Sequence, residues 1–472
     1  TSGESAIVKV DRTAPVAPGQ PTASLAGFTA ATSATIVDGT AGSDPESGVA
    51  SSQLYRRMAT LANGVCGTYG AGSIHASPDA SLVGGACYTY YTLVTNGVGL
   101  SAASPETPAI LVDTTAPTTP PTPTLLQSGF TAAATIDVSA GSSSDPESGL
   151  ASWTVFRRSA PLAAGVCGTW EAPVAVAVPD ASAATGACHA YFSVATNRVG
   201  VSVTSGESAI VKVDRTAPVA PPIPVPSPSG YTSSTTVSLG SVLPGSDPES
   251  GIVSTVIYRK AAPLTNGVCG SYGPAMVSGA LDTVAAGGSC YVYSVVSTNG
   301  LGVSTSSGDS TVVKVDTSAP VFTTATTTTP SGATNAGLVT ITPASATDGE
   351  SPITATQLYR KSALYLGGSC GVFGSAIPVS SPDLNVFADL CYTYSTVVTN
   401  ASGLTANSGD GDPVRIDRTG PTVASFTAPV ATTDQTTATF ALTFGEPVVG
   451  LGVDDFTTGG TSGGWTVAGI SG

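Results

Sequence analysis

Basic, aromatic and strongly apolar segments are scarce in this sequence of 472 residues. Lys and Arg number 16 against 31 acidic residues, which gives a net charge of −15 at pH 7. Nucleic acids and anionic membranes are bound largely through dense Lys and Arg, so the sequence predicts neither as a partner. It contains no long apolar run that would span a bilayer. With 55 Gly, 35 Pro and 2 Met, long amphipathic helices are not expected either.

Motifs for catalysis and metal binding are also missing. The 2 His, His75 and His189, stand at unrelated positions and have no matching Ser or Cys partner in the sequence. There is no GxxxxGK[ST] phosphate loop and no HExxH helix motif. The 8 Cys lack the CxxC spacing of zinc sites. We therefore expect no enzyme activity, no catalytic residues and, apart from the calcium considered below, no cofactor.

Internal repetition is the main feature that the sequence does have. An acidic-Pro junction, VDRTAP in its first copy, recurs around Asp11, Asp113, Asp214, Asp316 and Asp417. A second motif, DPESG, begins at Asp44, Asp145 and Asp247 and weakens to DGES at Asp348. Both motifs recur every 101 or 102 residues. A fixed period of this kind is typical of tandem domains.

The junctions divide the chain into whole repeats with a partial unit at each end. The whole repeats are expected at 12–113 (repeat 1), 114–214 (repeat 2), 215–316 (repeat 3) and 317–417 (repeat 4). Residues 1–18 match 204–221 letter for letter, so we expect 1–11 to be the last strand of a preceding repeat. Residues 418–472 lack Cys and DPESG and are expected to be a partial, divergent module.

Such a chain is expected to belong to a much longer polypeptide. The alternative is strand complementation, in which residues 1–11 complete the last module of a neighbouring copy.

Each repeat predicts about seven short strands. In repeat 1, the segments 33–40, 49–58, 87–95 and 107–113 alternate or run apolar and β-branched, between clusters of Gly, Pro, Asn and Asp. That pattern is typical of an antiparallel β-sandwich of about 100 residues. Because each junction is rich in Pro, the linkers are expected to be stiff and extended.

Two stretches carry a resemblance to known families. Residues 81–104, SLVGGACYTYYTLVTNGVGLSAAS, are similar to the last two strands of a fibronectin type III domain. Residues 44–57, DPESGVASSQLYRR, resemble the loop and third strand of bacterial fibronectin-III or immunoglobulin-like repeats. The DRTAP junctions resemble those of giant bacterial surface proteins and adhesins, and 418–472 resembles another bacterial immunoglobulin-like module. The resemblance implies an all-β tandem array of antiparallel Ig-like and fibronectin III-like sandwiches in an elongated rod.

The Cys residues form four pairs, each with members 21 positions apart. The pairs are Cys66 and Cys87, Cys167 and Cys188, Cys269 and Cys290, and Cys370 and Cys391. In a sandwich, the third strand runs toward the pole where the penultimate strand begins, so the partners can meet there. We expect four disulfides, which the family generally lacks, each contributing about 3 kcal/mol by the chain-entropy model. An oxidising, extracellular or cell-surface location in a bacterium follows.

Carboxylates are expected to gather at the junctions, because the entry linker and two loops of such a sandwich share one pole. The four sets are Asp11, Asp44, Glu46 and Asn96; Asp113, Asp145, Glu147 and Asn197; Asp214, Asp247, Glu249 and Asn299; and Asp316, Asp348, Glu350 and Asn400. Oxygen-rich sets of this kind suit calcium. The alternative is a hydrogen-bonded type I turn, with the junction residues Arg12, Arg215 or Arg418 neutralising the carboxylates.

Basic and aromatic residues also recur in fixed positions. The third strand of each repeat carries a basic pair: Arg56-Arg57, Arg157-Arg158, Arg259-Lys260 and Arg360-Lys361. One member of each pair is expected to point outward, where it blocks strand association or pairs with the acidic positions Glu4, Glu106, Glu207, Asp309 and Asp410. The recurring tyrosines Tyr90, Tyr191, Tyr293 and Tyr394 are expected in the core with their hydroxyls satisfied.

Together these features predict a structural role. The chain is expected to be a stalk or fibre segment of a large extracellular bacterial surface protein, adhesin-like or filament-forming. Its expected partners are further repeats of the same polypeptide and identical chains in a fibre. The alternative is an accessory, non-catalytic region of a secreted polysaccharide-degrading enzyme.

Overall fold

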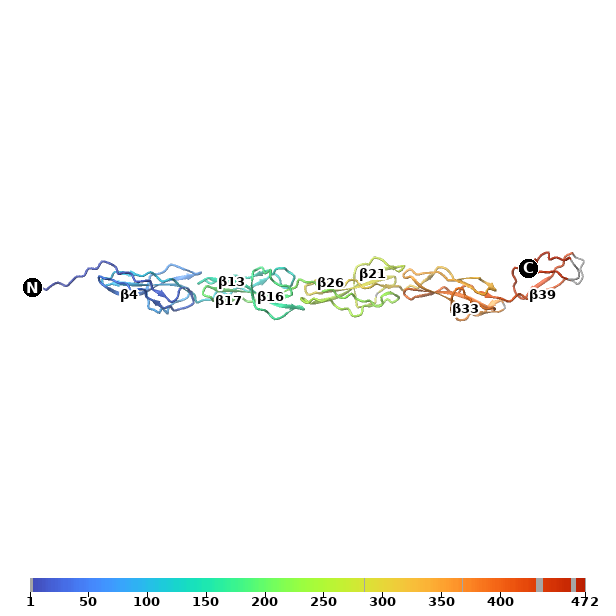
Figure 1. Cartoon of the computed structure of the whole chain (residues 1–472), viewed down its shortest axis with the longest axis horizontal. Coiled ribbons are helices and arrows are strands. Elements are labelled where there is room, and N and C mark those ends of the chain that lie inside the picture. Colours follow the sequence, from blue (N-terminus) through green and yellow to red (C-terminus); the bar gives the residue numbers. More distant parts are fainter. Residues whose placement is uncertain (1–2, 284, 367, 430–435, 460–463, 472) are drawn as a thin grey trace. The chain divides into compact units, whose positions relative to one another are not determined.

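The structure is a computed structural model that describes residues 3–283, 285–366, 368–429, 436–459 and 464–471, nearly all of them in short β-strands and loops (Figure 1). The described residues contain no α-helix and a single 3-10 turn, Val453–Asp455. Within them, no helix has the length and apolarity needed to cross a membrane. The all-β prediction is confirmed.

The chain divides into two compact units. One comprises Thr1–Pro222, Leu243–Thr255 and Val296–Ser306, and the other comprises Ile223–Val242, Val256–Val295 and Ser307–Gly472. Repeats 1 and 2 lie in the first unit, repeat 4 lies in the second, and repeat 3 contributes to both. The units do not follow the expected repeat boundaries, which stay a prediction.

Repeat 1 is built around two long antiparallel strands, β4 (Val49–Ala62) and β7 (Ala86–Asn96). They belong to a seven-stranded sheet ordered β2-β9-β7-β4-β5, with β6 against β4 and β8 against β7. The shorter strands are β1 (Thr22–Ala23), β2 (Gly27–Thr29), β3 (Ile36–Val37), β5 (Val65–Cys66), β6 (Ser73–Ile74), β8 (Ser101–Ala103) and β9 (Ile110–Val112). β1 and β3 form a separate two-stranded sheet, and Ile36 of β3 packs in one cluster with Tyr88 and Tyr90 of β7. The repeat is therefore a small sandwich.

Repeat 2 has the same arrangement in the same unit. Its strands are β10 (Thr124–Leu125), β11 (Gly129–Thr131), β12 (Val138–Ser139), β13 (Leu150–Ala163), β14 (Val166–Cys167), β15 (Val174–Val176), β16 (Ala187–Asn197), β17 (Ser202–Thr204) and β18 (Val211–Val213). Its seven-stranded sheet follows the order β11-β18-β16-β13-β14, which matches that of repeat 1 strand for strand.

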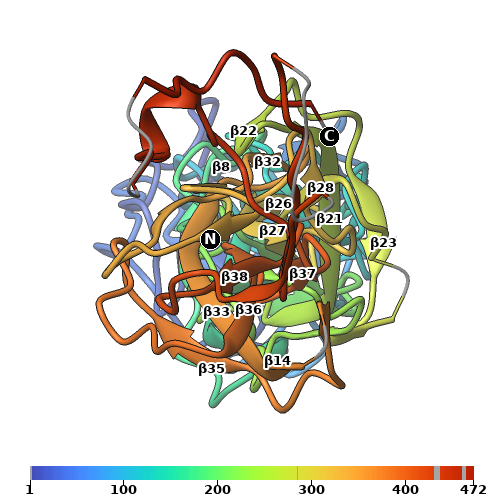
Figure 2. The same cartoon turned by 90° about the vertical axis from the view of Figure 1, so that its right-hand side faces the viewer.

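Repeats 3 and 4 keep this sheet order. The strands of repeat 3 are β19 (Gly230–Thr232), β20 (Val237–Ser238), β21 (Ile252–Thr265), β22 (Val268–Cys269), β23 (Met276–Ser278), β24 (Leu281–Asp282), β25 (Ser289–Asn299), β26 (Ser304–Ser306) and β27 (Val313–Val315). Those of repeat 4 are β28 (Val321–Phe322), β29 (Thr327–Thr329), β30 (Ala333–Thr334), β31 (Thr340–Thr342), β32 (Ala346–Thr347), β33 (Ile353–Leu366), β34 (Ser369–Cys370), β35 (Ile377–Val379), β36 (Leu390–Asn400), β37 (Thr405–Asn407) and β38 (Val414–Ile416). Figure 2 labels β33, β36 and β38 of repeat 4, which are neighbours in its sheet in the order β38-β36-β33.

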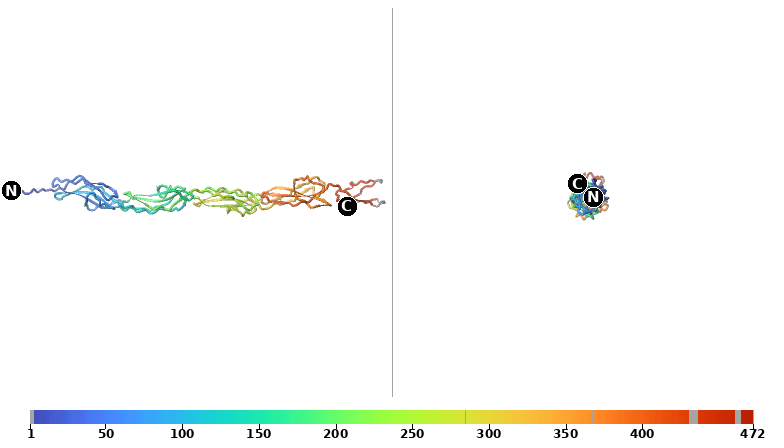
Figure 3. Two further views of the ribbon diagram at one scale, coloured as in Figure 1. Left: turned by 90° about the horizontal axis from the view of Figure 1, so that it is seen from below. Right: turned by 90° about the vertical axis from the view of Figure 1, so that its left-hand side faces the viewer.

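The second long strand of each repeat, such as β7, is buried over most of its length, which matches its mostly apolar sequence. In β7, Tyr88 and Tyr90 face the sandwich core, whereas Cys87 faces a second cluster with Ala59 and Leu61. Figure 3 gives two further views of the ribbon. Each repeat thus has a main core and, near the hairpin that follows its longest strand, a smaller region that contains the Cys pair.

The two end segments differ from the repeats. Residues 3–11 form no strand, and Ile7 is 90% exposed. The identical segment in repeat 2 forms β18 and buries Val211 and Val213 completely. In the segment 418–472, β39 (Val423–Thr427) pairs with β40 (Ala441–Phe444). The assignment of 1–11 as the last strand of a preceding repeat stays a prediction.

Candidate functional site

The acidic residues that the sequence predicts at one pole do lie together. In repeat 2, Asn197 Nδ2 donates to Asp113 Oδ2 and to Asp145 Oδ2, at 3.1 Å in each case. The Oδ1 of Asn197 accepts the Val201 N–H at 2.9 Å, which fixes the direction of the amide. The Asn and both Asp side chains are buried. One Asn therefore joins the linker carboxylate to the carboxylate of the DPESG turn.

The remaining carboxylate oxygens are used within the turn and the linker. Asp145 Oδ1 accepts the backbone N–H groups of Glu147 and Ser148 at 3.1 and 2.9 Å. Asp113 Oδ1 accepts the Thr115 N–H at 2.9 Å, and the Thr115 hydroxyl donates to Glu147 Oε2 at 3.1 Å. Side-chain oxygens that cap nearby amides in this way are typical of Asp-initiated turns.

The same Asn-centred pattern recurs in the other three sets. The distances from Asn Nδ2 to the linker Asp and to the turn Asp are 2.8 and 2.9 Å at Asn96, 3.4 and 2.9 Å at Asn299, and 2.9 and 2.9 Å at Asn400. The acceptors are Asp11 and Asp44, Asp214 and Asp247, and Asp316 and Asp348. Thr13, Thr216 and Ser318 donate to Glu46, Glu249 and Glu350. Every residue of the four predicted sets is thus placed at its junction.

Each linker aspartate between two whole repeats, Asp113, Asp214 and Asp316, also contacts both of them. The Asp113 N–H donates to Thr29 O of repeat 1 at 3.0 Å, whereas its carboxylate binds Asn197 of repeat 2. The Asp214 N–H donates to Thr131 O at 3.0 Å, and the Asp316 N–H donates to Thr232 O at 2.9 Å. All three Asp residues are fully buried. No flexible residue separates the last strand of one repeat from the polar network of the next.

The network favours ionised carboxylates. Burial works against ionisation of Asp247 and Asp348, but hydrogen bonds from Asn299 or Asn400 and from turn amides lower the pKa of both groups. Burial and the nearby Asp113 raise the pKa of Glu147. The N–H donors around Asp247 and Asp348 therefore favour the charged form of these two turn aspartates.

The junction carboxylates suit calcium in type and spacing, but their Asn does not. Oxygens of Asp214, Asp247 and Glu249 lie within 4.8 Å of one another, a separation that one cation can bridge. Asn299 directs its N–H groups at these carboxylates, and its Oδ1 accepts the backbone N–H of Val303. These contacts match the alternative interpretation from the sequence, a hydrogen-bonded turn without a metal ion. Calcium at these junctions stays a prediction.

The junction arginines do not neutralise these carboxylates, so that part of the alternative is wrong. Arg215 donates to the carbonyls of Ala133 and Ala183 at 2.7 and 2.9 Å, and Arg418 donates to Val386 O at 3.0 Å. Among the described residues, neither these two nor Arg12 forms an ion pair. The side chains of Arg215 and Arg418 turn back onto the repeat that they follow.

A second polar cluster, at the centre of each sandwich, was missed from the sequence. Tyr90 donates to Asp79 Oδ2 at 2.7 Å, and Arg56 Nη1 donates to the same oxygen at 2.9 Å. Asp79 is 4% exposed and Tyr90 is fully buried, so the predicted core Tyr with a satisfied hydroxyl is confirmed. Burial alone would raise the pKa of Asp79, but hydrogen bonds from Ser81, Tyr90 and Arg56 lower it to about 2.

The cluster recurs once in every repeat. Its Tyr-Asp-Arg members are Tyr90, Asp79 and Arg56; Tyr191, Asp180 and Arg157; Tyr293, Asp282 and Arg259; and Tyr394, Asp383 and Arg360. The four Asp residues follow the same period of 101 or 102 residues, and that spacing was the available signal.

The second basic residue of each third-strand pair points outward, as predicted for one member. It pairs with the acidic position of its own repeat: Arg57 with Glu106, Arg158 with Glu207, Lys260 with Asp309, and Lys361 with Asp410, at 2.7 to 2.9 Å. These side chains are partly exposed, so each pair is worth at most about 1 kcal/mol.

All four predicted disulfides are present, and no Cys is unpaired. Each joins a two-residue strand, such as β5, to the start of the second long strand, such as β7. The Cα–Cα distance is 5.8 Å. Four disulfides indicate an oxidising, extracellular location.

One expectation about His is wrong. His189 does have a Ser partner, with its Nδ1 at 3.0 Å from Ser159 Oγ, and its Nε2 lies 3.1 Å from Ala184 O. The ring is 1% exposed in the core of repeat 2, at the position of Tyr88 in repeat 1. Because both ring nitrogens have partners and no substrate reaches the ring, the pair gives no support to catalysis.

No family model and no curated protein matches the chain. Solved structures similar to it are tandem repeats of adhesion proteins. A tetra-tandem repeat from the extending region of a large adhesion protein is 16% identical, with a TM-score of 0.25, over 84% of this chain and 100% of that one.

Two further similar structures come from other repeat proteins. A segment of a 1.5-MDa bacterial ice-binding adhesin is 15% identical, with a TM-score of 0.24, over 65% of this chain and 100% of that one. Extracellular cadherin domains 1–5 of protocadherin gamma B2 are 13% identical, with a TM-score of 0.25, over 87% of this chain and 82% of that one. Scores this low carry no function from those proteins to this chain.

Proposed function

We propose that this chain is a non-catalytic spacer segment of a large extracellular protein, with an adhesin-like role at a bacterial surface. The observation that carries the proposal is the double attachment of each linker aspartate between whole repeats, namely Asp113, Asp214 and Asp316. Its backbone N–H is held by the preceding repeat and its carboxylate by the following one. A segment that sets distance needs this continuity at every junction.

The use of polar residues supports the same role. In each repeat, the buried charged groups serve either the junction network or the Tyr-Asp-Arg cluster, at equivalent positions. Catalytic or ligand-binding sites usually place a few polar groups at an apolar cavity. Here the carboxylates of both polar clusters accept hydrogen bonds from neighbouring side chains and amides.

Small-angle X-ray scattering of the whole chain tests the proposal. A spacer is expected to give a pair-distance distribution with a long tail, which indicates an extended particle, at low and high protein concentration alike. A compact particle would overturn the spacer role. A particle that lengthens with concentration would show that identical chains assemble into a fibre.

Glycan binding separates the proposal from the accessory region of a polysaccharide-degrading enzyme. A glycan array probed with the whole chain is expected to show no signal above that of an unrelated disulfide-bonded β-sandwich. Selective binding to one polysaccharide class would favour the enzyme-associated role.

A further inference from the structure

The hairpin that follows each long strand reaches the next repeat. In repeat 1, β4 and β5 are joined by Asn63 and Gly64, whose φ angles of 49° and 80° form the two-residue turn that tight hairpins prefer. The Asn63 N–H donates to Pro146 O at 2.9 Å, and the Gly64 N–H donates to Glu147 O at 2.8 Å. Both acceptors belong to the DPESG turn of repeat 2, so two backbone donors at the hairpin tip bind two backbone acceptors of the neighbour.

The contact recurs at the next two junctions. Ala164 and Gly165 donate to Pro248 O and Glu249 O at 2.9 and 2.8 Å, and Asn266 and Gly267 donate to Gly349 O and Glu350 O at 2.8 and 2.9 Å. All four tip residues again have positive φ. Three independent occurrences show that this backbone contact, here called the tip contact, is a regular part of the junction.

Glycine is required at the tip for two reasons. A left-handed φ strains other residues, and a methyl group on Gly64 would lie 2.6 Å from Ser148 O of repeat 2. At Gly165 the methyl would lie 3.3 Å from Ser250 O, a tight contact but a milder one than at Gly64. The Asn-centred network holds the partner turn in place, because Asp145 binds the amides of that turn.

The disulfide begins two residues after the tip glycine. Gly64 is followed by Cys66, Gly165 by Cys167 and Gly267 by Cys269. In repeat 1, the short strand β5 has only two residue pairs with β4, Leu61 with Cys66 and Ala62 with Val65. The Gly67 N–H adds one hydrogen bond to Thr60 O at 2.8 Å, and the bond from Cys66 to Cys87 ties this short strand covalently to β7.

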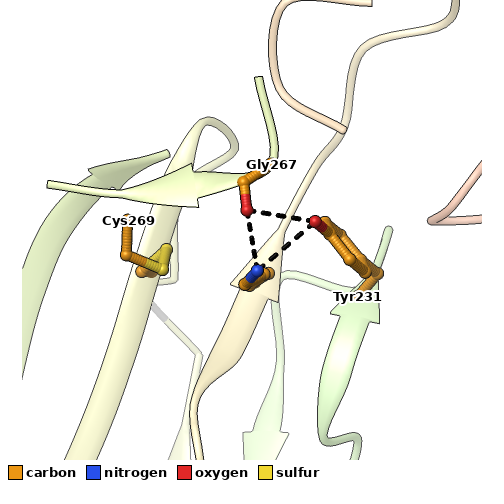
Figure 4. The surroundings of a disulfide bond; sticks show 5 residues. Tyr231, Gly267 and Cys269 are labelled. Atoms are coloured by element: carbon orange, nitrogen blue, oxygen red, sulfur yellow. Dashed lines mark hydrogen bonds between the residues drawn. A yellow bond between two sulfur atoms is a disulfide. The ribbon is translucent and has the colours of Figure 1, made fainter. Parts of the chain in front are cut away.

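In repeats 2 and 3 a lysine also binds the carbonyl of the tip glycine, whereas in repeat 1 the guanidinium of Arg198 from repeat 2 lies over the Phe28 ring at 5.3 Å. Lys314 Nζ donates to Gly267 O at 2.7 Å and lies 4.7 Å from the centre of the Tyr231 ring, and the Tyr231 hydroxyl also donates to Gly267 O at 3.1 Å. Figure 4 shows the Tyr231 hydroxyl and the Gly267 carbonyl joined beside Cys269. Lys212 donates to Gly165 O at 2.7 Å in repeat 2, whereas the equivalent residue of repeat 1 is Leu111.

We propose that the disulfides of repeats 1, 2 and 3 serve the junctions: each holds the tip contact against the following repeat, so its loss loosens the junction before it unfolds the repeat. The main core of repeat 1, formed around Tyr88, Tyr90 and Ile110, contains no Cys. The disulfide lies in the separate small cluster with Ala59 and Leu61. This role goes beyond the spacer function, because it assigns the bonds to junctions and not to repeat stability.

Hydrogen exchange of the whole chain, read at single amides, tests this role. In the double variant Cys66→Ser/Cys87→Ser, the Asn63 and Gly64 amides are expected to exchange more than about tenfold faster, while Ile110 and Val112 in β9 stay within about threefold of wild type. Unchanged tip amides would overturn the proposal. An equal loss of protection in β9 would overturn it too, since the bond would then serve the repeat.

Two matched variants sharpen the test. In Cys167→Ser/Cys188→Ser, Lys212 still holds the Gly165 carbonyl, so the loss of tip protection is expected to be smaller than in repeat 1. If repeat 1 fails to fold without its disulfide, this variant still tests the order of events. In Cys370→Ser/Cys391→Ser, no DPESG turn follows in the sequence, so the three tip contacts are expected to be unchanged. Loosening of those contacts by this variant would contradict a local role.

Discussion

Replacing Asp79 by Asn in the Tyr-Asp-Arg cluster is expected to destabilise repeat 1 strongly. Asp79→Asn keeps the shape of the side chain but removes the charge that Arg56 and Tyr90 bind. The Arg56 side chain is only 15% exposed, so its charge would be left largely desolvated. Breaking a buried ion pair from one side costs about 3–5 kcal/mol.

The pKa of Asp79 gives a second, smaller value, which covers only the preference for the charged form of its side chain. Its ordinary pKa of 3.8 falls to about 2 in the folded repeat. At about 1.4 kcal/mol per pKa unit, the charged form stabilises folding by about 2 kcal/mol. Because the folded pKa is the lower one, this contribution is present above about pH 4 and is lost as the pH falls toward 2. The Asn variant lacks it at every pH.

Hydrogen exchange of the whole chain measures the effect repeat by repeat. A loss of about 3–5 kcal/mol predicts that the β7 and β9 amides exchange roughly 10²- to 10⁴-fold faster at neutral pH. Glu106→Gln is the control, because it weakens the partly exposed pair with Arg57 and is expected to change exchange by less than about fivefold. Repeats 3 and 4 serve as internal references. A change below about tenfold in Asp79→Asn would refute the reasoning.

Two further predictions concern acid and calcium. Burial lowers the pKa of His189, whose ring contacts Ser159 and Ala184 and feels the charges of Arg157, Asp180 and Arg215. Because the folded pKa is the lower one, the folded state of repeat 2 is expected to lose stability as the pH falls below about 6.5. His189→Tyr introduces the residue found at this position in repeat 1 and is expected to remove the loss of stability, measured by hydrogen exchange of repeat 2 between about pH 7 and 5. The same pH profile in the variant and the wild type would contradict this prediction. We also propose calcium at the junctions: the thermal midpoint is expected to rise with calcium relative to chelator, and less in Asp247→Asn. An identical midpoint with calcium, magnesium or chelator would exclude that proposal.

Side-chain patterns allowed much of the junction to be predicted from the sequence. The spacing of Asp113, Asp145 and Asn197 follows the repeat period, and the order of strands in a sandwich places all three at one pole. The Cys pairs were predictable for the same reason. The partner of Tyr90 was not, since a lone Asp between strands has no local motif, and only the spacing of Asp79 from its three equivalents marks it.

The tip contact could not be predicted in the same way. Its donors and acceptors are backbone groups, which every residue carries, and the only sequence signal is the glycine at Gly64, Gly165 and Gly267. The side-chain directions of Arg215 and Arg418 could not be predicted either, because a long side chain beside a junction can turn toward either neighbouring segment. Carbonyls of the preceding repeat bind these two guanidinium groups.

The shared aspartates make neighbouring repeats depend on one another. Because Asp214 ends β18 through its backbone and binds Asn299 through its carboxylate, unfolding repeat 2 would also remove a buried partner from the network of repeat 3. The tip contact acts in the same direction, since Pro248 O and Glu249 O would lose their donors. In arrays of this kind, stability is approximately the sum of the repeats and of the interfaces between neighbours. Loss of one repeat therefore weakens its neighbours first, and a spacer built this way resists the opening of a single junction better than independent domains on flexible linkers would.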